Sequence, residues 1–136
     1  MKRKIYNEML LWKQNAQGKS ALMIDGARRI GKSYIVEEFA KNEYKSYILV
    51  DFNNADDNLI EIFNKYLGNL DVFFSYLALY YNVTLYHRDT LIVFDEVQLY
   101  PKARAAIKYL VKDGRYDYIE TGSLVSINRN VKDIVI

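Results

Sequence analysis

The feature of this sequence that most limits how the chain can fold is the spacing Gly-x-x-x-x-Gly-Lys-Ser, which begins at Gly26 and ends at Ser33. The apolar run at residues 20–25 predicts a short buried strand, and residues 34–40 predict a helix that continues to about Asn42. A glycine-bounded turn from a buried strand into a helix is typical of α/β folds. The stretch therefore predicts a sheet that is covered by helices.

The same stretch has the chemistry of a phosphate site. Gly26 and Gly31 let the backbone turn its N–H groups toward an anion, and the helix that opens at Lys32 adds unpaired N–H groups and a positive dipole end. In this strand–loop–helix context, the P-loop or Walker A motif, the lysine reaches the β- and γ-phosphates and the serine hydroxyl binds Mg²⁺. The predicted nucleotide-binding residues are Gly26, Ala27, Arg28, Arg29, Ile30, Gly31, Lys32, Ser33 and Tyr34. Ser33 is also a predicted metal ligand.

The side chains of Arg28 and Arg29 are expected to point away from the phosphates, because the backbone of such a loop faces them. Two interpretations stay open for these arginines: solvation or pairing with a nearby acid, and contact with a neighbouring subunit. We favour the first, because exposed arginines and surface ion pairs are common.

A second motif lies downstream, where four apolar residues, 91–94, precede Asp95 and Glu96. This pattern predicts a buried strand of the Walker B type. Because ligands of doubly wound sheets sit at the carboxyl ends of the strands, both carboxylates are expected to face the phosphates. Asp95 is the second predicted Mg²⁺ ligand, and Glu96 is the predicted group that polarises a water for attack on the γ-phosphate.

The remaining pattern alternates between helices and strands. Helices are predicted at residues 2–15, 57–67 and 70–81 and from Pro101 through Leu110 to a stop at Asp113-Gly114, and strands at residues 46–52 and 116–121. Such alternation predicts a parallel sheet with right-handed crossovers, as in the three-layer α/β/α core of P-loop NTPases.

Composition narrows the function classes. The chain has 136 residues, enough for one domain, and its net charge of only +2 gives no electrostatic footprint for nucleic acid or membrane. It has no cysteine and one histidine, His87, so thiolate and histidine metal clusters are excluded. No stretch approaches the length of a transmembrane helix, and a reducing, cytoplasmic setting is expected.

The three motifs Gly-Ala-Arg-Arg-Ile-Gly-Lys-Ser, Phe-Asp-Glu-Val-Gln and Glu-Thr-Gly-Ser resemble a large family of predicted prokaryotic AAA+ ATPases. The resemblance runs from the first helix to about Ser126. It implies ATP and Mg²⁺ as ligands, and a polar residue at the end of the fourth strand that senses the γ-phosphate. Thr121 is the first choice for this sensor and Ser123 the second. In that family a lid and a C-terminal domain of unsettled function, sometimes compared to nucleases, usually follow the ATPase core.

The chain also departs from the family pattern. We recognise no fifth strand beside the P-loop strand, no helical lid and no sensor-2 arginine, and Arg129 is either an arginine finger or a solvated side chain. We therefore interpret residues 1–136 as one core of a longer protein, with a leading helix in 1–18 and a cut tail at 124–136, truncated before the fifth strand. An unpaired edge of the P-loop strand would favour dimerisation.

The expected function is Mg²⁺-dependent ATP hydrolysis, weak in the isolated domain, that acts on an unknown protein or nucleic-acid partner through a C-terminal region. The sequence leaves open whether the domain forms a homo-oligomer. Two alternative functions also stay open: a nucleotide-dependent interaction switch with negligible turnover, and a small-molecule kinase. A GTPase is disfavoured, because Asp95 is followed by Glu-Val-Gln rather than D-x-x-G and no N-K-x-D motif is present.

Overall fold

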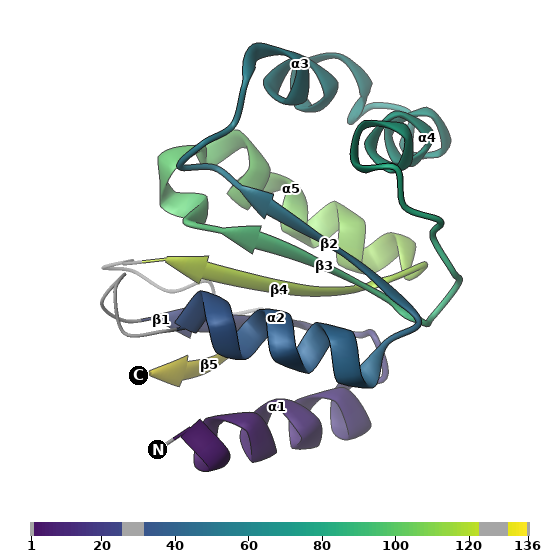
Figure 1. The fold of residues 1–136 in the computed structure, drawn as a ribbon. Helices are drawn as coiled ribbons and strands as arrows, with labels where there is room; N and C mark the ends of the chain where they lie inside the picture. The colour runs from purple at the N-terminus through teal and green to yellow at the C-terminus, as the bar shows by residue number, and fades with distance from the viewer. Residues whose placement is uncertain (1, 26–31, 123–130, 136) are drawn as a thin grey trace.

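The computed structural model describes residues 2–25, 32–122 and 131–135, which form a sheet between two layers of helices (Figure 1). In chain order the elements are α1 (Lys2–Ala16), β1 (Ala21–Asp25), α2 (Lys32–Glu43), β2 (Ser46–Asp51), α3 (Asp57–Tyr66), α4 (Leu70–Tyr81), β3 (Thr90–Asp95), the 3-10 turn η1 (Val97–Leu99), α5 (Pro101–Asp113), β4 (Asp117–Gly122) and β5 (Val131–Val135). The helices and strands predicted from periodicity are confirmed, and their boundaries shift by no more than about two residues.

The sheet is parallel throughout, with the strand order β2-β3-β4-β1-β5. The P-loop strand β1 therefore lies beside β4 and not beside β3. Ile24 is in register with Thr121, and Asp51 with Asp95, so the carboxyl ends of these strands meet at one edge of the sheet. This is the edge at which α/β sheets bind their ligands.

The fifth strand is present, and the prediction that the chain is truncated before it is wrong. β5 pairs in parallel with the whole of β1, from Ala21↔Val131 to Asp25↔Val135. The P-loop strand has a neighbour on both sides, so its edge is not open for dimerisation. Lys132 and Asp133 interrupt the apolar run of this strand, and such charges are tolerated at the sheet edge that β5 occupies.

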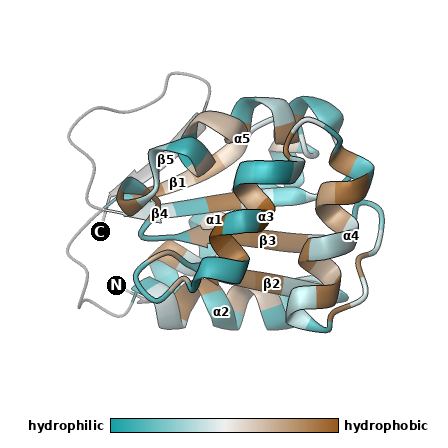
Figure 2. Ribbon diagram, turned by 90° about the horizontal axis from the view of Figure 1, so that it is seen from above, coloured by the Kyte–Doolittle hydropathy of each residue, from teal (hydrophilic) through white to brown (hydrophobic). Residues whose placement is uncertain are grey.

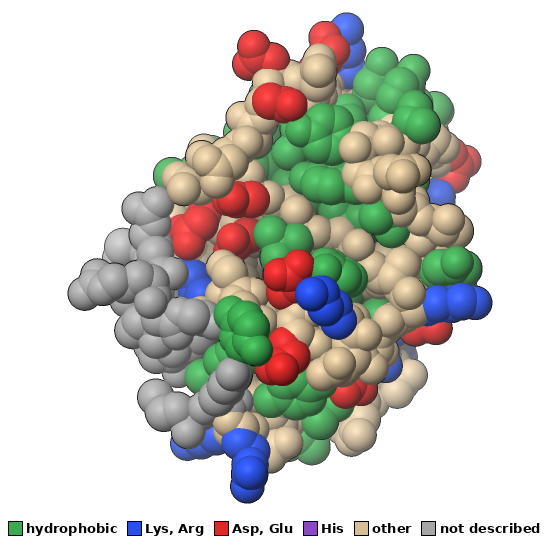
Figure 3. All heavy atoms as spheres, viewed as in Figure 1, with side chains coloured by type: hydrophobic (Ala, Val, Ile, Leu, Met, Phe, Trp, Pro, Cys, Tyr) green, Lys and Arg blue, Asp and Glu red, His purple; other side chains and the backbone are tan. Residues whose placement is uncertain are grey.

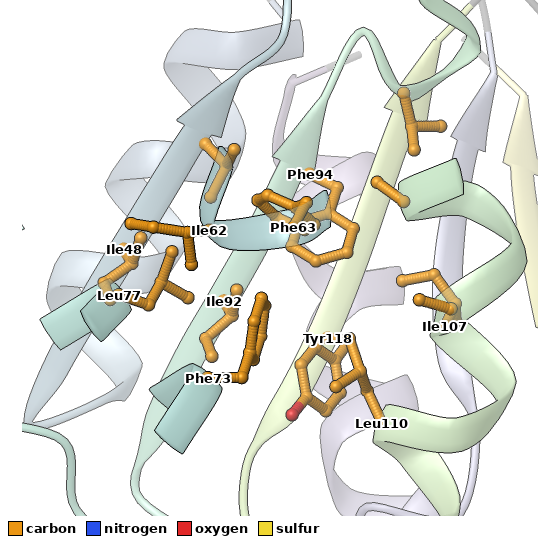
Figure 4. Close-up of a cluster of buried hydrophobic side chains, with 14 of the residues drawn as sticks. Ile48, Ile62, Phe63, Phe73, Leu77, Ile92, Phe94, Ile107, Leu110 and Tyr118 are labelled. Atoms are coloured by element: carbon orange, nitrogen blue, oxygen red, sulfur yellow. The ribbon is translucent and has the colours of Figure 1, made fainter. Parts of the chain in front are cut away.

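Each face of the sheet has its own core. Buried side chains of α1 and α2, such as Met9 and Phe39, pack on Leu22 and Val93 on one face. On the other face the cluster joins α3, α4 and α5, and Phe63 meets Phe94 edge to face at a centroid distance of 5.6 Å (Figure 4). Seen from above, the apolar strands β2 and β3 lie beneath helices in which hydrophilic and hydrophobic residues are mixed (Figure 2). The strands β1 and β3 are thus buried on both sides, as their continuous apolar runs predict, and β4 between them is buried as well.

Local signals set the helix boundaries. The Asp56 carboxylate accepts the N–H of Leu59 at 2.9 Å and so caps the start of α3. Pro101 occupies the first turn of α5, and Gly114, with φ 81°, ends that helix in the left-handed conformation.

None of the helices in the described part of the chain is both long and apolar enough to cross a membrane.

Two buried tyrosines differ in their hydrogen bonding. The Tyr44 hydroxyl donates to Asp117 Oδ2 at 2.5 Å, and Arg88 pairs with the other oxygen of that carboxylate. The Tyr118 hydroxyl is buried and has no hydrogen-bond partner among the described residues. Burial raises the pKa of both hydroxyls well above the usual range for tyrosine, and Asp117 raises the pKa of Tyr44 further.

We expect these two hydroxyls to contribute oppositely to stability. Tyr118→Phe removes an unsatisfied polar atom from the core and should leave the free energy of unfolding unchanged or raise it by up to about 1 kcal/mol. Tyr44→Phe removes a buried hydrogen-bond donor to Asp117 and should lower the free energy of unfolding by about 1–3 kcal/mol. Urea titrations followed by the fluorescence of the single tryptophan, Trp12, measure both. Equal losses in the two variants would contradict this assignment.

Candidate nucleotide site

The site lies where α2 begins and β3 and β4 end. Lys32, the first residue of α2, is fully buried, and its Nζ lies 3.6 Å from Oε2 of Glu96. Burying two charges is costly unless they pair, so each of these side chains stabilises the other in this position. The predicted residues Gly26, Ala27, Arg28, Arg29, Ile30 and Gly31 lie outside the described part of the chain.

Asp95 is the centre of the cluster. The Ser33 hydroxyl donates to its carboxylate at 3.1 Å and 3.2 Å, and the Thr121 hydroxyl donates to Oδ1 at 2.5 Å. These three residues come from α2, β3 and β4. The carboxylate is buried, with 7% of the residue exposed, and hydroxyl donors replace the water it has lost.

Thr121 also holds the backbone of the acidic motif, since its Oγ1 accepts the N–H of Glu96 at 3.2 Å. The first choice for the sensor therefore lies inside the cluster. The second choice, Ser123, and the arginine-finger candidate, Arg129, lie outside the described residues.

Glu96 leaves the strand in a left-handed conformation, with φ 57° and ψ 47°. A non-glycine residue in this region is uncommon and costs free energy, which the surroundings must offset. The turn brings the side chain toward Lys32, and the Gln98 amide donates to Glu96 Oε1 at 2.8 Å. Gln98 was not among the predicted site residues; its signal in the sequence is its place at the end of the motif Phe-Asp-Glu-Val-Gln, two residues after Glu96.

Two further residues differ from the cluster in exposure. Tyr34, included among the predicted nucleotide-binding residues, has 59% of its surface exposed and extends into solvent. His87 is exposed in the turn before β3.

The donor set suits a hard cation. Ser33 and Asp95 offer a hydroxyl and a carboxylate, and acidic side chains gather at the end of the molecule toward which the strands run (Figure 3). Within the described residues no group of three or more His, Cys, Asp or Glu side chains could hold a metal alone. Mg²⁺ needs no such cage, because it commonly takes one or two protein oxygens and completes its shell with water and substrate phosphates.

One hollow that the described residues form lies elsewhere. It has a volume of about 830 Å³, and its lining includes Gly18, Arg88 and Gly114, which precede strands β1, β3 and β4. It therefore lies at the amino ends of the strands, opposite the carboxylates. The chemistry of the side chains, and not the size of a cavity, identifies the candidate site.

The Thr121 hydroxyl gives a test of how the cluster is held together. Thr121→Val keeps the shape of the side chain but removes its hydroxyl. Asp95 then loses one donor and the Glu96 N–H loses its acceptor, so the free energy of unfolding should fall by about 1–3 kcal/mol. Thr121→Ser keeps the hydroxyl and is the matched control, with a loss of under about 1 kcal/mol expected. Urea denaturation compares them, and equal losses would show that the methyl group matters and the hydrogen bonds do not.

Comparison with known proteins agrees with this geometry. A family model described as "AAA domain" matches residues 18–133, while no curated protein matches the chain. Among solved structures, that of C. elegans PCH-2 aligns with 99% of this chain at a TM-score of 0.54 and 14% identity, which shows a shared fold. The chain corresponds to 40% of the length of the PCH-2 chain. The chain thus belongs to the AAA domain family, and its parallel α/β sheet is the core of an AAA+ P-loop ATPase, a type of domain that binds nucleotide.

Proposed function

We propose that this domain binds ATP with Mg²⁺ and hydrolyses it. The observation that supports this most directly is the convergence of Lys32, Ser33, Asp95, Glu96 and Thr121 at the carboxyl edge of the sheet. These residues come from three elements and supply a cation, two hydroxyls and two carboxylates. Phosphoryl transfer to water needs such a set, because it depends on positioning and on charge stabilisation.

In this proposal Lys32 and the backbone of residues 26–33 hold the phosphates. Lys32 is buried beside Glu96, so a phosphate must compete with that carboxylate for the ammonium group. Ser33 and Asp95 hold Mg²⁺, which supplies positive charge to the β- and γ-phosphates. On magnesium binding the Ser33 hydroxyl would turn an oxygen lone pair to the cation, and Asp95 would bind directly or through water.

Glu96 would act as the general base. The oxygen of a water bonds to the γ-phosphorus as the bond to the bridging oxygen breaks, and the electron pair of that bond leaves with ADP. The proton of the water passes to the Glu96 carboxylate and then to solvent. Thr121 would contact the γ-phosphate, a role that rests on the family resemblance.

A nucleotide-dependent switch with very slow turnover is the second candidate. The observation in its favour is that Glu96 already contacts the buried ammonium group of Lys32. A carboxylate that stays paired with this ammonium group is not available to take a proton from water. In either case the output would come through regions beyond this domain or through a neighbouring copy that contributes an arginine finger.

Lys32→Ala should weaken the binding of Mg²⁺ and a slowly hydrolysed ATP analogue by at least tenfold, because the phosphates lose their buried cation. Isothermal titration calorimetry measures this, and thermal melting checks that the variant is folded. Lys108→Ala, an exposed lysine on α5, is the control and should bind like the unaltered protein. Equal affinity in all three proteins would remove Lys32 from the binding site.

Glu96→Gln should leave nucleotide affinity within about threefold but lower turnover by about 10²–10⁴-fold, the usual contribution of a general base. Release of inorganic phosphate at saturating ATP measures turnover. Glu61→Gln, an exposed carboxylate paired with Lys65, is the control. Unchanged phosphate release in Glu96→Gln would exclude Glu96 as the base. Phosphate found only on an added acceptor would instead favour a kinase.

A further inference from the structure

Gln98 makes a direct contact with the proposed general base. It lies in the turn η1, which two backbone hydrogen bonds hold in shape. The Leu99 N–H donates to the Glu96 carbonyl oxygen at 3.1 Å, and the Tyr100 N–H donates to the Val97 carbonyl oxygen at 3.0 Å. From this turn the amide Nε2 donates to Glu96 Oε1 at 2.8 Å. The donor therefore comes from a constrained segment next to the glutamate and not from a flexible loop.

The other end of the Gln98 amide lies against β4. A Cβ atom built at Gly122, the last residue of that strand, would lie only 2.2 Å from Gln98 Oε1. The next-nearest atom outside the Gln98 side chain, Val97 N, is at an ordinary 3.6 Å. A side chain at position 122 would thus displace Gln98. Gly122 directly follows Thr121, so the amide touches the strand that carries the proposed sensor.

The orientation of the amide follows from its surroundings. Gln98 Oε1 is buried and has no hydrogen-bond partner among the described residues, while Nε2 faces the carboxylate. The reversed orientation would place an amide oxygen against the Glu96 carboxylate, acceptor against acceptor. Only the observed orientation donates to Glu96, and it leaves the oxygen unsatisfied. A buried unsatisfied polar atom in a native fold calls for an explanation, and a catalytic role is one.

We propose that Gln98 is a positioning residue, which aims the Glu96 carboxylate and links its direction to the end of β4. Lys32 can leave Glu96 for a phosphate, whereas Gln98 stays between the carboxylate and Gly122. A shift of the Thr121–Gly122 backbone would move the surface on which the amide rests and so turn Glu96. This inference rests on the proposed role of Glu96 as the base.

The test uses Gln98→Met, which has a similar length but no amide. This variant should keep nucleotide affinity within about threefold and lower turnover at saturating ATP by about ten- to a hundredfold, because a misplaced reacting group slows chemistry more than binding. In the Glu96→Gln background, Gln98→Met should change turnover no further. Unchanged turnover in Gln98→Met, or a loss of equal size in the Glu96→Gln background, would overturn the proposal.

Gly122 gives an independent test of the spatial argument. Gly122→Ala should lower turnover as Gln98→Met does, since the new methyl group displaces the amide. In the Gln98→Ala background the same methyl group meets no amide oxygen, so Gly122→Ala should have no further effect there. Losses that multiply in the double variant would show that Gly122 acts by another route and would contradict the link.

A measurement without turnover separates the inference from the proposed function. The side-chain NH₂ signals of Gln98, assigned by their absence in Gln98→Met, should shift in ¹H–¹⁵N spectra when Glu96 is changed to Gln, because their acceptor changes from a carboxylate to an amide. Signals that do not respond would overturn the contact itself. A clear shift, with normal turnover in Glu96→Gln, would refute the catalytic role of Glu96 and with it the positioning role of Gln98.

Discussion

The arrangement of the site depends on one buried carboxylate. Asp95 lies at the end of β3, and the hydroxyls of Ser33 and Thr121 donate to it from α2 and from β4. A carboxylate with so little exposure is stable only when donors surround it, so the three elements are held in one relative position. Through Thr121 the same network reaches the N–H of Glu96 and fixes where the next side chain begins.

The sheet supplies the precision that this network needs. β3 and β4 pair in register from Leu91↔Asp117 to Phe94↔Glu120, so Asp95 and Thr121 follow one step later as cross-strand neighbours. Alternation along each strand directs Phe94 to the core under α3, α4 and α5, and its neighbours in the sequence to the opposite face, where α2 lies. Both cores are therefore required to place Ser33 opposite Asp95.

Much of this arrangement could be predicted from local patterns. The apolar runs before Gly26 and before Asp95 identify buried strands, and the chemistry of Lys32 and Ser33 predicts a phosphate site, so the sequence alone predicts that both motifs lie at one edge of the sheet. β5 was missed because Lys132 and Asp133, its second and third residues, are charged, and an edge strand lacks the apolar run by which central strands are recognised. Gln98 was missed because its position depends on two features that local patterns do not show. One is the left-handed turn at Glu96, and the other is Gly122, which lies on β4, 24 residues after Gln98.

In the proposed mechanism the buried pair of Lys32 and Glu96 connects binding to chemistry. An ammonium group that leaves this carboxylate for a phosphate exchanges one ionic contact for another, so part of the binding free energy would be spent on opening the pair. The Gln98 amide contacts the other oxygen of the same carboxylate, and this contact does not involve the ammonium group. Because an amide is neutral, it can hold the carboxylate while Lys32 moves without adding a charge beside it.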